Sequence, residues 1–235
     1  MVAGPNGSGK STLVEQLRTG YSVPLGHNLN PDILERDLRD RGALSFSKWD
    51  VIVKESELRD FLQNHPLASR SAVPEIVLKN NVLSVKTRLP GGYFAAILSN
   101  FLRKRWLAAR ASFTFETVMS SIDKVELFKE ALGLGYRTYL YYVCTNSPRI
   151  NYDRVTARVS RGGHDVPPQK IGERYNRSLA LLPRAIEFSS RAYLFDNSGD
   201  SRVQVAEFKD GKMAEVSKTP AAWFVALCEK RLFKI

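Results

Sequence analysis

Nine consecutive residues near the start of the chain have the types and spacing of a phosphate-binding loop. They fit the pattern G-x-x-x-x-G-K-[ST] and are Gly4, Pro5, Asn6, Gly7, Ser8, Gly9, Lys10, Ser11 and Thr12. Glycines let the backbone turn tightly and bring its N–H groups close to phosphate oxygens. Lys10 is predicted to reach the β- and γ-phosphates, and the Ser11 hydroxyl to bind Mg²⁺. The stretch therefore predicts a site for ATP or GTP with Mg²⁺.

The residues on either side of this loop have the pattern that the motif requires. The apolar residues Met1, Val2 and Ala3 precede it, and residues 12–17 read as a helix whose positive N-terminal end faces the phosphates. A chance match in a Gly/Ser-rich turn is the alternative. A strand before the loop and a helix after it favour the phosphate site.

Acidic residues follow two of the predicted strands. Asp32 lies between a short strand near residue 29 and a helix over 33–41, and Glu116 and Thr117 close a strand over 111–117. In open parallel sheets, ligands bind at the carboxyl ends of the strands, so Asp32 is placed to meet a substrate hydroxyl. A role for Asp32 as a helix N-cap fits its position equally well.

A third acidic residue, Asp196, ends the last predicted core strand. It is followed by Asn197 and not by the glutamate that many ATPases place there. Two interpretations stay open for Asp196, a second metal-site aspartate and a loop on the adenine side of the nucleotide.

Two rows of cations lie on the helices predicted between residues 150 and 180. The rows have helical i, i+4, i+7 spacing and consist of Arg154, Arg158 and Arg161, then Lys170, Arg174 and Arg177. A Gly/Pro-rich hinge over 162–168 separates them. Cations on hinged helices predict a lid that neutralises a transferring phosphoryl group. A solvated charged face is the alternative.

The composition allows several classes of partner. The chain has 235 residues, a formal net charge of +11 and a pI near 9.7, which suits nucleic acid or an anionic nucleotide substrate. No apolar run is long enough to span a membrane, so we expect no membrane partner. The two cysteines, Cys144 and Cys228, lack metal-ligand spacing and are expected to be buried thiols in a reducing, cytoplasmic compartment.

Alternating helices and strands predict an α/β fold. We expect a single domain over 1–235, a three-layer sandwich with a mostly parallel sheet, a helical lid over 150–180, and a hairpin plus helix as a C-terminal extension over 201–235. Residues 42–92 are the least regular part and are expected to form a substrate-side insertion. The basic run Arg103–Arg105 is predicted to be a solvated face, with nucleic-acid contact as the alternative.

Five segments in this order resemble the zeta toxin-like P-loop kinase family. They are Gly4–Thr12, Asn30–Asp32, Phe113–Thr117, the hinge stretch Arg158–Pro167, and Phe195–Gly199. The phosphate loop alone is shared by many NTPases, whereas the hinge stretch is far more specific. Residues 42–92 are where the chain departs from these toxins.

The resemblance implies ATP- or GTP-dependent transfer of a phosphoryl group to a small hydroxyl-bearing substrate, UDP-N-acetylglucosamine in the toxins. By that analogy, Asp32 is the general base, and Glu116 and Thr117 lie near substrate and metal. Lys10, Arg158 and Arg161 are catalytic phosphate-binding residues and Arg174 contacts the substrate. An antitoxin protein is the partner that the family implies.

Two other classes of function remain open from the sequence. The net charge permits an ATP-hydrolysing motor associated with nucleic acid or transport, although no Leu-Ser-Gly-Gly-Gln signature occurs. A nucleotide-binding regulator without turnover is the other, and the retention of Lys10, Ser11, Asp32 and Glu116 argues against it.

Overall fold

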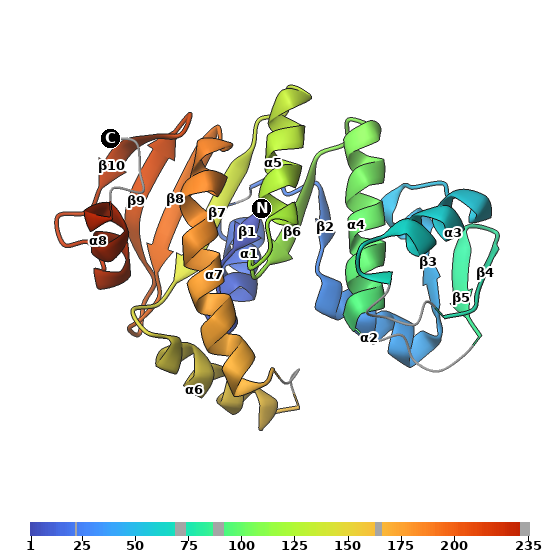
Figure 1. Cartoon of the computed structure of the whole chain (residues 1–235), viewed down its shortest axis with the longest axis horizontal. Helices are drawn as coiled ribbons and strands as arrows, with labels where there is room; N and C mark the ends of the chain where they lie inside the picture. The colour runs from blue at the N-terminus through green and yellow to red at the C-terminus, as the bar shows by residue number, and fades with distance from the viewer. Residues whose placement is uncertain (22, 69–73, 87–91, 163–165, 231–235) are drawn as a thin grey trace. The chain divides into compact units, whose positions relative to one another are not determined.

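The computed structural model describes residues 1–21, 23–68, 74–86, 92–162 and 166–230. The chain divides into two compact units. Unit 1 comprises Met1–Val23 and Glu116–Ile235, and unit 2 comprises Pro24–Phe115. Figure 1 shows the helices and strands of both units.

Unit 1 is built on a mostly parallel sheet. Its elements, in chain order, are β1 (Val2–Ala3), α1 (Lys10–Thr19), the last two residues of β6 (Phe113–Thr117), α5 (Asp123–Gly133), β7 (Tyr139–Cys144), α6 (Pro148–Val159), α7 (Pro168–Glu187), β8 (Arg191–Asp196), β9 (Val203–Lys209), β10 (Lys212–Val216) and α8 (Ala222–Glu229). The strand order is β10-β9-β8-β7-β1-β6. Strands β6, β1, β7 and β8 run parallel, and β9 and β10 are antiparallel additions. The α/β class with a mostly parallel sheet is therefore confirmed.

Strand β7 lies in the middle of this sheet and carries much of the core. It pairs in parallel with β1 on one side and β8 on the other, and Leu140, Tyr142 and Val143 are fully buried. A near-continuous apolar run is what a parallel strand covered on both faces requires. Helices α5 and α7 pack on the face of the sheet turned to the viewer in Figure 1.

The last strands of unit 1 form the hairpin expected after residue 201. Asp210 and Gly211 both have positive φ angles, 49° and 76°, between β9 and β10. Two such residues form the hairpin turn whose twist matches that of the flanking strands. Helix α8 ends at Glu229.

Unit 2 combines helices with a small antiparallel sheet. Its elements are β2 (His27–Leu29), α2 (Pro31–Arg41), β3 (Ala43–Ser45), the 3₁₀ helix η1 (Phe46–Trp49), α3 (Glu55–Asn64), β4 (Ile76–Lys79), β5 (Val82–Val85), α4 (Gly92–Ala108) and the first three residues of β6. Strand β2 pairs in parallel with β6, and β3, β5 and β4 form an antiparallel sheet in that order. Residues 42–92, irregular by sequence, thus contain a β4–β5 hairpin closed by Asn80 and Asn81, both with positive φ.

The basic run on α4 is only partly the solvated face that its charge suggested. Arg103 is 1% exposed, and its guanidinium lies 4.9 Å from the centre of the Phe115 ring. The expectation is therefore wrong for Arg103, because packing within unit 2 outweighs the local charge pattern there. Arg105 forms an ion pair of 2.5 Å with Glu57 on α3 and keeps 36% of its side-chain surface exposed, as a solvated face allows.

Candidate functional site

The loop between β1 and α1 can be formed only by residues without side chains at its tightest points. A Cβ atom at Gly4, where φ is +142°, would lie 2.0 Å from the carbonyl oxygen of Val143. A Cβ atom at Gly7, where φ is +74°, would lie 2.6 Å from the carbonyl oxygen of Asn151. The glycines therefore allow the loop to pass directly against the backbone of β7 and α6.

Two asparagine side chains hold the loop backbone from different elements. Asn151 Nδ2, on α6, donates a 2.5 Å hydrogen bond to the carbonyl oxygen of Asn6, and Asn197 Nδ2, after β8, donates one of 2.8 Å to that of Ser8. Sequence reasoning missed both roles. Asn197 at the carboxyl end of a core strand was a usable signal, whereas nothing in the local pattern marked Asn151.

The end of the loop is arranged to receive an anion. Gly9 is the N-cap of α1, no side chain caps that helix, and its first turn carries no acidic residue. The N–H groups and positive dipole at a helix N-terminus attract phosphate. Lys10 begins the helix, and its Nζ lies 2.8 Å from the carbonyl oxygen of Pro5, so the ammonium reaches back along the loop.

Two buried polar atoms in the loop fit a polar ligand. Asn6 Oδ1 and Ser8 Oγ have no hydrogen-bond partner among the described residues. Buried polar atoms in proteins are nearly always paired, so such groups in a glycine-rich loop are consistent with a site that is completed by a bound molecule.

A carboxylate lies against the hydroxyl predicted to bind metal. Ser11 Oγ donates a 2.7 Å hydrogen bond to Glu116 Oε2, and Glu116 is 8% exposed. Hydroxyl and carboxylate oxygens are ligands that Mg²⁺ accepts beside phosphates and water. Among the described residues no group of three or more His, Cys, Asp or Glu side chains could hold a metal ion. The oxygen pair therefore fits Mg²⁺ brought in with a nucleotide.

Thr117 supports the loop through its backbone and its side chain. Its carbonyl oxygen accepts a 3.2 Å bond from the Gly4 N–H, and its hydroxyl oxygen accepts one of 3.0 Å from the Met119 N–H. Met119 has a φ of +53° and is fully buried. The structure thus brings Glu116 and Thr117 together with the phosphate loop in unit 1.

Asp196 is engaged by its own loop. Its carboxylate accepts hydrogen bonds from the Ser198 N–H and hydroxyl, at 3.1 and 2.8 Å, and from Trp223 Nε1 at 3.0 Å. These contacts tie the carboxylate of Asp196 to the 196–199 loop and to Trp223 of α8.

The cationic rows are less regular than their spacing indicated. Helix α6 ends at Val159, so Arg161 lies beyond it, and Arg154 turns to the 196–199 loop, donating to the carbonyl oxygens of Asn197 and Gly199 at 2.6 and 3.4 Å. The expectation of one shared face for the first row is therefore wrong for Arg161, because α6 stops at Val159, whereas Arg154 and Arg158 keep the i, i+4 spacing on this helix.

The remaining cations of the two helices lie toward solvent. Arg158 and Arg161 are exposed and Arg174 is half-buried, while Arg177 pairs with Glu173 at 3.4 Å. Within the expected hinge, residues 163–165 lie outside the described residues.

Asp32, the expected general base, belongs to unit 2. It is exposed in the first turn of α2, and its backbone N–H donates a 2.9 Å bond to Asn30 Oδ1. The cap of α2 is therefore Asn30, and the carboxylate of Asp32 is not the helix cap.

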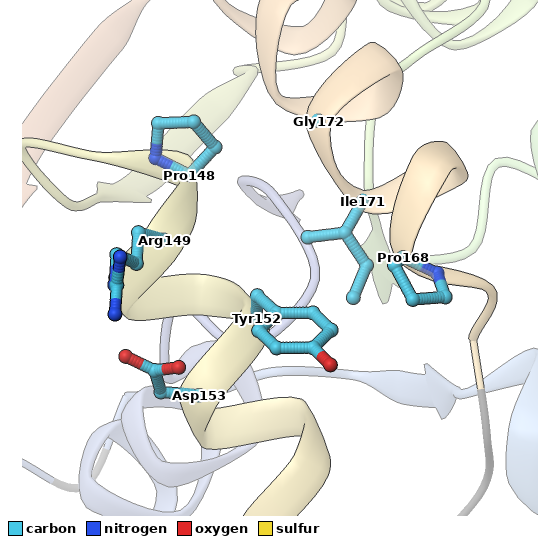
Figure 2. Close-up of a pocket in the computed structure, with 7 residues that line it drawn as sticks. All are labelled: Pro148, Arg149, Tyr152, Asp153, Pro168, Ile171 and Gly172. Atoms are coloured by element: carbon cyan, nitrogen blue, oxygen red, sulfur yellow. The ribbon is translucent and has the colours of Figure 1, made fainter.

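An open pocket separates the N-terminal ends of α6 and α7 (Figure 2). Its volume is about 500 Å³ and it is lined by Pro148, Arg149, Tyr152, Asp153, Pro168, Ile171 and Gly172. Figure 2 shows the ring of Tyr152 extending from α6 toward Ile171 and Pro168 of α7. No sequence pattern indicated this pocket.

No described helix is long and apolar enough to cross a membrane.

Cys144 is buried and Cys228 only partly buried, so the expectation of two buried thiols is right for the first alone.

Solved structures share the fold of this chain at low sequence identity. The crystal structure of AvrRxo1-ORF1:-ORF2 with ATP gives a TM-score of 0.56 at 15% identity, and that of AvrRxo1-ORF1:AvrRxo1-ORF2 with sulphate ions gives 0.54 at 16%. Each match covers 97% of this chain and 61% of the other, so the chain spans about three fifths of those proteins. A structure from the PezAT chromosomal toxin-antitoxin system of Streptococcus pneumoniae has a TM-score of 0.48 at 13% identity and covers 98% of this chain and 81% of that one. No family model and no curated protein matches the sequence.

Proposed function

We propose that this chain is a P-loop kinase that transfers the γ-phosphoryl group of ATP to a hydroxyl of a small molecule. The observation that carries the proposal is the phosphate loop with Glu116 hydrogen-bonded to its serine, Ser11. A nucleotide-binding loop beside a carboxylate at a strand end suits phosphoryl transfer, where catalysis is mainly positioning and charge stabilisation. The likeness in fold to the AvrRxo1 complex with ATP supports ATP as the donor.

The residues divide the chemistry among them. Loop N–H groups and Lys10 bind the β- and γ-phosphates, and Arg158, Arg161 and Arg174 neutralise charge that develops on the moving group. Ser11 and Glu116 would hold Mg²⁺, which supplies further charge neutralisation on the phosphate oxygens. The acceptor oxygen bonds to the γ-phosphorus, the bond to the β–γ bridging oxygen breaks, and ADP leaves. Asp32 takes the proton of the acceptor hydroxyl.

The acceptor that we propose is UDP-N-acetylglucosamine, and it rests on the resemblance to zeta toxins. The basic net charge of +11 is compatible with a substrate that carries phosphates of its own. Residues 42–92 are proposed to form the wall on the sugar side. An antitoxin protein is the corresponding partner, and a reducing cytoplasm the corresponding compartment.

A substrate panel tests the proposal directly. The protein is incubated with labelled ATP, Mg²⁺ and, separately, nucleotide sugars, free sugars, nucleosides, DNA and RNA, with Lys10→Ala as the inactive control. We expect a UDP-sugar to gain the mass of one phosphate in the wild type only. Transfer to a free sugar or nucleoside alone would keep the kinase and discard this acceptor. ATP hydrolysis that needs DNA or RNA, without transfer, would replace the kinase by a nucleic-acid-dependent ATPase.

A further inference from the structure

We propose that Asn151 is a positioning residue for the phosphate loop, and that Thr145 and Tyr175 connect it to helix α7 through buried hydrogen bonds. The consequence is that the shape of the loop depends on where the second lid helix lies. The part of this inference that concerns turnover rests on the proposed kinase function, whereas the part that concerns loop structure does not.

The first link joins α6 to the loop. Asn151 is fully buried, and its Nδ2 donates the 2.5 Å bond to the carbonyl oxygen of Asn6. The carbonyl oxygen of Asn151 is also the atom that a Cβ at Gly7 would meet at 2.6 Å. One residue of α6 therefore contacts two successive residues of the loop, through its side chain and through its backbone.

The second link supports the Asn151 amide from its other end. The carbonyl oxygen of Asn6 can only accept, so the amide nitrogen is the atom directed at it. The amide oxygen then faces Thr145, which is fully buried just after β7 and donates from its hydroxyl to Asn151 Oδ1. The same hydroxyl also lies 3.1 Å from the carbonyl oxygen of Ser147, as a second acceptor.

The third link reaches α7. The hydroxyl of Tyr175, which is 5% exposed, donates a 2.6 Å bond to the carbonyl oxygen of Thr145. Burial raises the pKa of Tyr175, so its hydroxyl remains a proton donor. The Tyr175 bond ends on the backbone carbonyl of Thr145, which also accepts from the Cys144 thiol at 3.5 Å, and the side chain of the same residue makes the next link. The covalent frame of Thr145 thus joins the Tyr175 bond to the Asn151 bond. A displacement of α7 therefore reaches Asn6 through three hydrogen bonds.

The two helices that carry the lid arginines are packed together beside this relay. Val155 of α6, Ile171 of α7 and Val166, just before α7, form a small buried cluster, with Val159 packed against it. Arg174, the proposed substrate-side cation, is the residue before Tyr175 on α7. The relay thus couples the position of that arginine to the conformation of the phosphate loop.

Hydrogen exchange in the nucleotide-free protein tests the relay without assuming any activity. The main variant is Asn151→Leu, which keeps the side-chain shape and removes the donor. Thr145→Val and Tyr175→Phe remove the second and third links. The matched control is Ser178→Ala, a buried residue of α7 whose hydroxyl lies 3.1 Å from the Tyr142 hydroxyl and makes none of the three linking hydrogen bonds.

We expect the three relay variants to exchange faster at the amides of residues 6–9, with Asn151→Leu the largest effect. The dissociation constant of ATP should rise about tenfold in Asn151→Leu, the scale of leaving a buried carbonyl unpaired, and about threefold in Tyr175→Phe. Ser178→Ala should change the urea midpoint and leave loop exchange and ATP affinity as in the wild type.

Two results would overturn the relay. The first is that Asn151→Leu and Thr145→Val, compared with Ser178→Ala at equal stability, show the same amide exchange in the loop and the same ATP affinity. The second is that Tyr175→Phe changes loop exchange and ATP affinity no more than Ser178→Ala does. A wild type that does not bind ATP would defeat the proposed kinase, and the exchange measurement would still judge the relay.

Discussion

The hydroxyl of Ser11 donates a 2.7 Å hydrogen bond to Glu116 Oε2, which joins the first turn of α1 to the end of β6. The carboxylate is 8% exposed and directly borders the phosphate loop. A divalent cation can bind where a buried carboxylate is hydrogen-bonded to a hydroxyl. The cation takes the place of that hydrogen bond, and each of the two groups supplies one oxygen ligand. The pair therefore predicts how the protein responds to Mg²⁺.

Glu116→Gln should raise the Mg²⁺ concentration needed for ATP binding and turnover by about tenfold or more, because the amide keeps the shape and loses the charge that binds the cation. Titration of Mg²⁺ at fixed ATP measures this. Glu126→Gln, at an exposed glutamate paired with Arg184, is the control and should behave as the wild type. An unchanged Mg²⁺ requirement in Glu116→Gln would remove this residue from the metal site.

Substitutions at Asp32 and Asn30 separate the role of a general base from that of the N-cap of α2. Asp32→Asn should lower the rate of transfer by roughly a hundredfold or more, the scale of a lost general base, and leave ATP affinity unchanged. Asn30→Ala should cost about 1 kcal/mol in the free energy of unfolding, since Asn30 caps α2. Rates and urea midpoints of both variants give the answer. A normal rate in Asp32→Asn would exclude it as the base.

The lid arginines should act on the moving phosphoryl group more than on binding. The double variant Arg158→Glu with Arg174→Glu is expected to slow transfer roughly a hundredfold, because these cations would face charge that grows in the transition state. Arg177→Glu is the control, since Arg177 already pairs with Glu173. Single-turnover rates and substrate affinities separate the two effects. Equal losses in rate and affinity would instead indicate a role in ground-state binding.

The stability of the protein should fall in alkaline solution through Cys144. Burial raises the pKa of this thiol to about 12 from an ordinary value of 9.0. The unfolded chain loses the proton near pH 9, whereas the folded protein keeps it until about pH 12. The stabilisation is therefore complete below about pH 9 and is lost above it, by at most about 1.4 kcal/mol per pH unit.

Urea unfolding between about pH 8 and about pH 11 measures that slope. Cys144→Ala should flatten this slope, because the packing that the substitution loses lowers the free energy of unfolding equally at every pH. Cys228→Ala should change the slope less, because Cys228 is only partly buried. A slope that is the same in Cys144→Ala and in the wild type would assign the alkaline loss to other groups.

The sequence predicted those parts of the site that are local in the chain. The loop glycines, Lys10 and Ser11 form one contiguous motif, and Glu116 lies where a strand of aromatic and β-branched residues ends. Each of these predictions depends only on residues that are neighbours in the sequence or on where one strand ends.

The contacts that the sequence did not predict join residues far apart in the chain. The side chain of Asn197 bonds Ser8 across 189 positions and that of Asn151 bonds Asn6 across 145, and asparagine is common in loops and at helix ends. Arg103 in a basic run looked exposed because charge patterns report the usual solvated state. Its burial depends on Phe115, which the local pattern does not bring near.

The C-terminal hairpin has a consequence for solubility. Strand β9 pairs with β8 along its length, from Arg191 with Lys209 to Asp196 with Val203. Without it, β8 would present a row of unpaired backbone groups on which another copy of the chain could add a strand. Among the described strands, β10 pairs with β9 alone. Most of its residues are exposed and its pairing is irregular between Met213 and Glu215, so a further strand would add to it poorly. The hairpin thus protects this edge of the sheet from pairing with another copy of the chain.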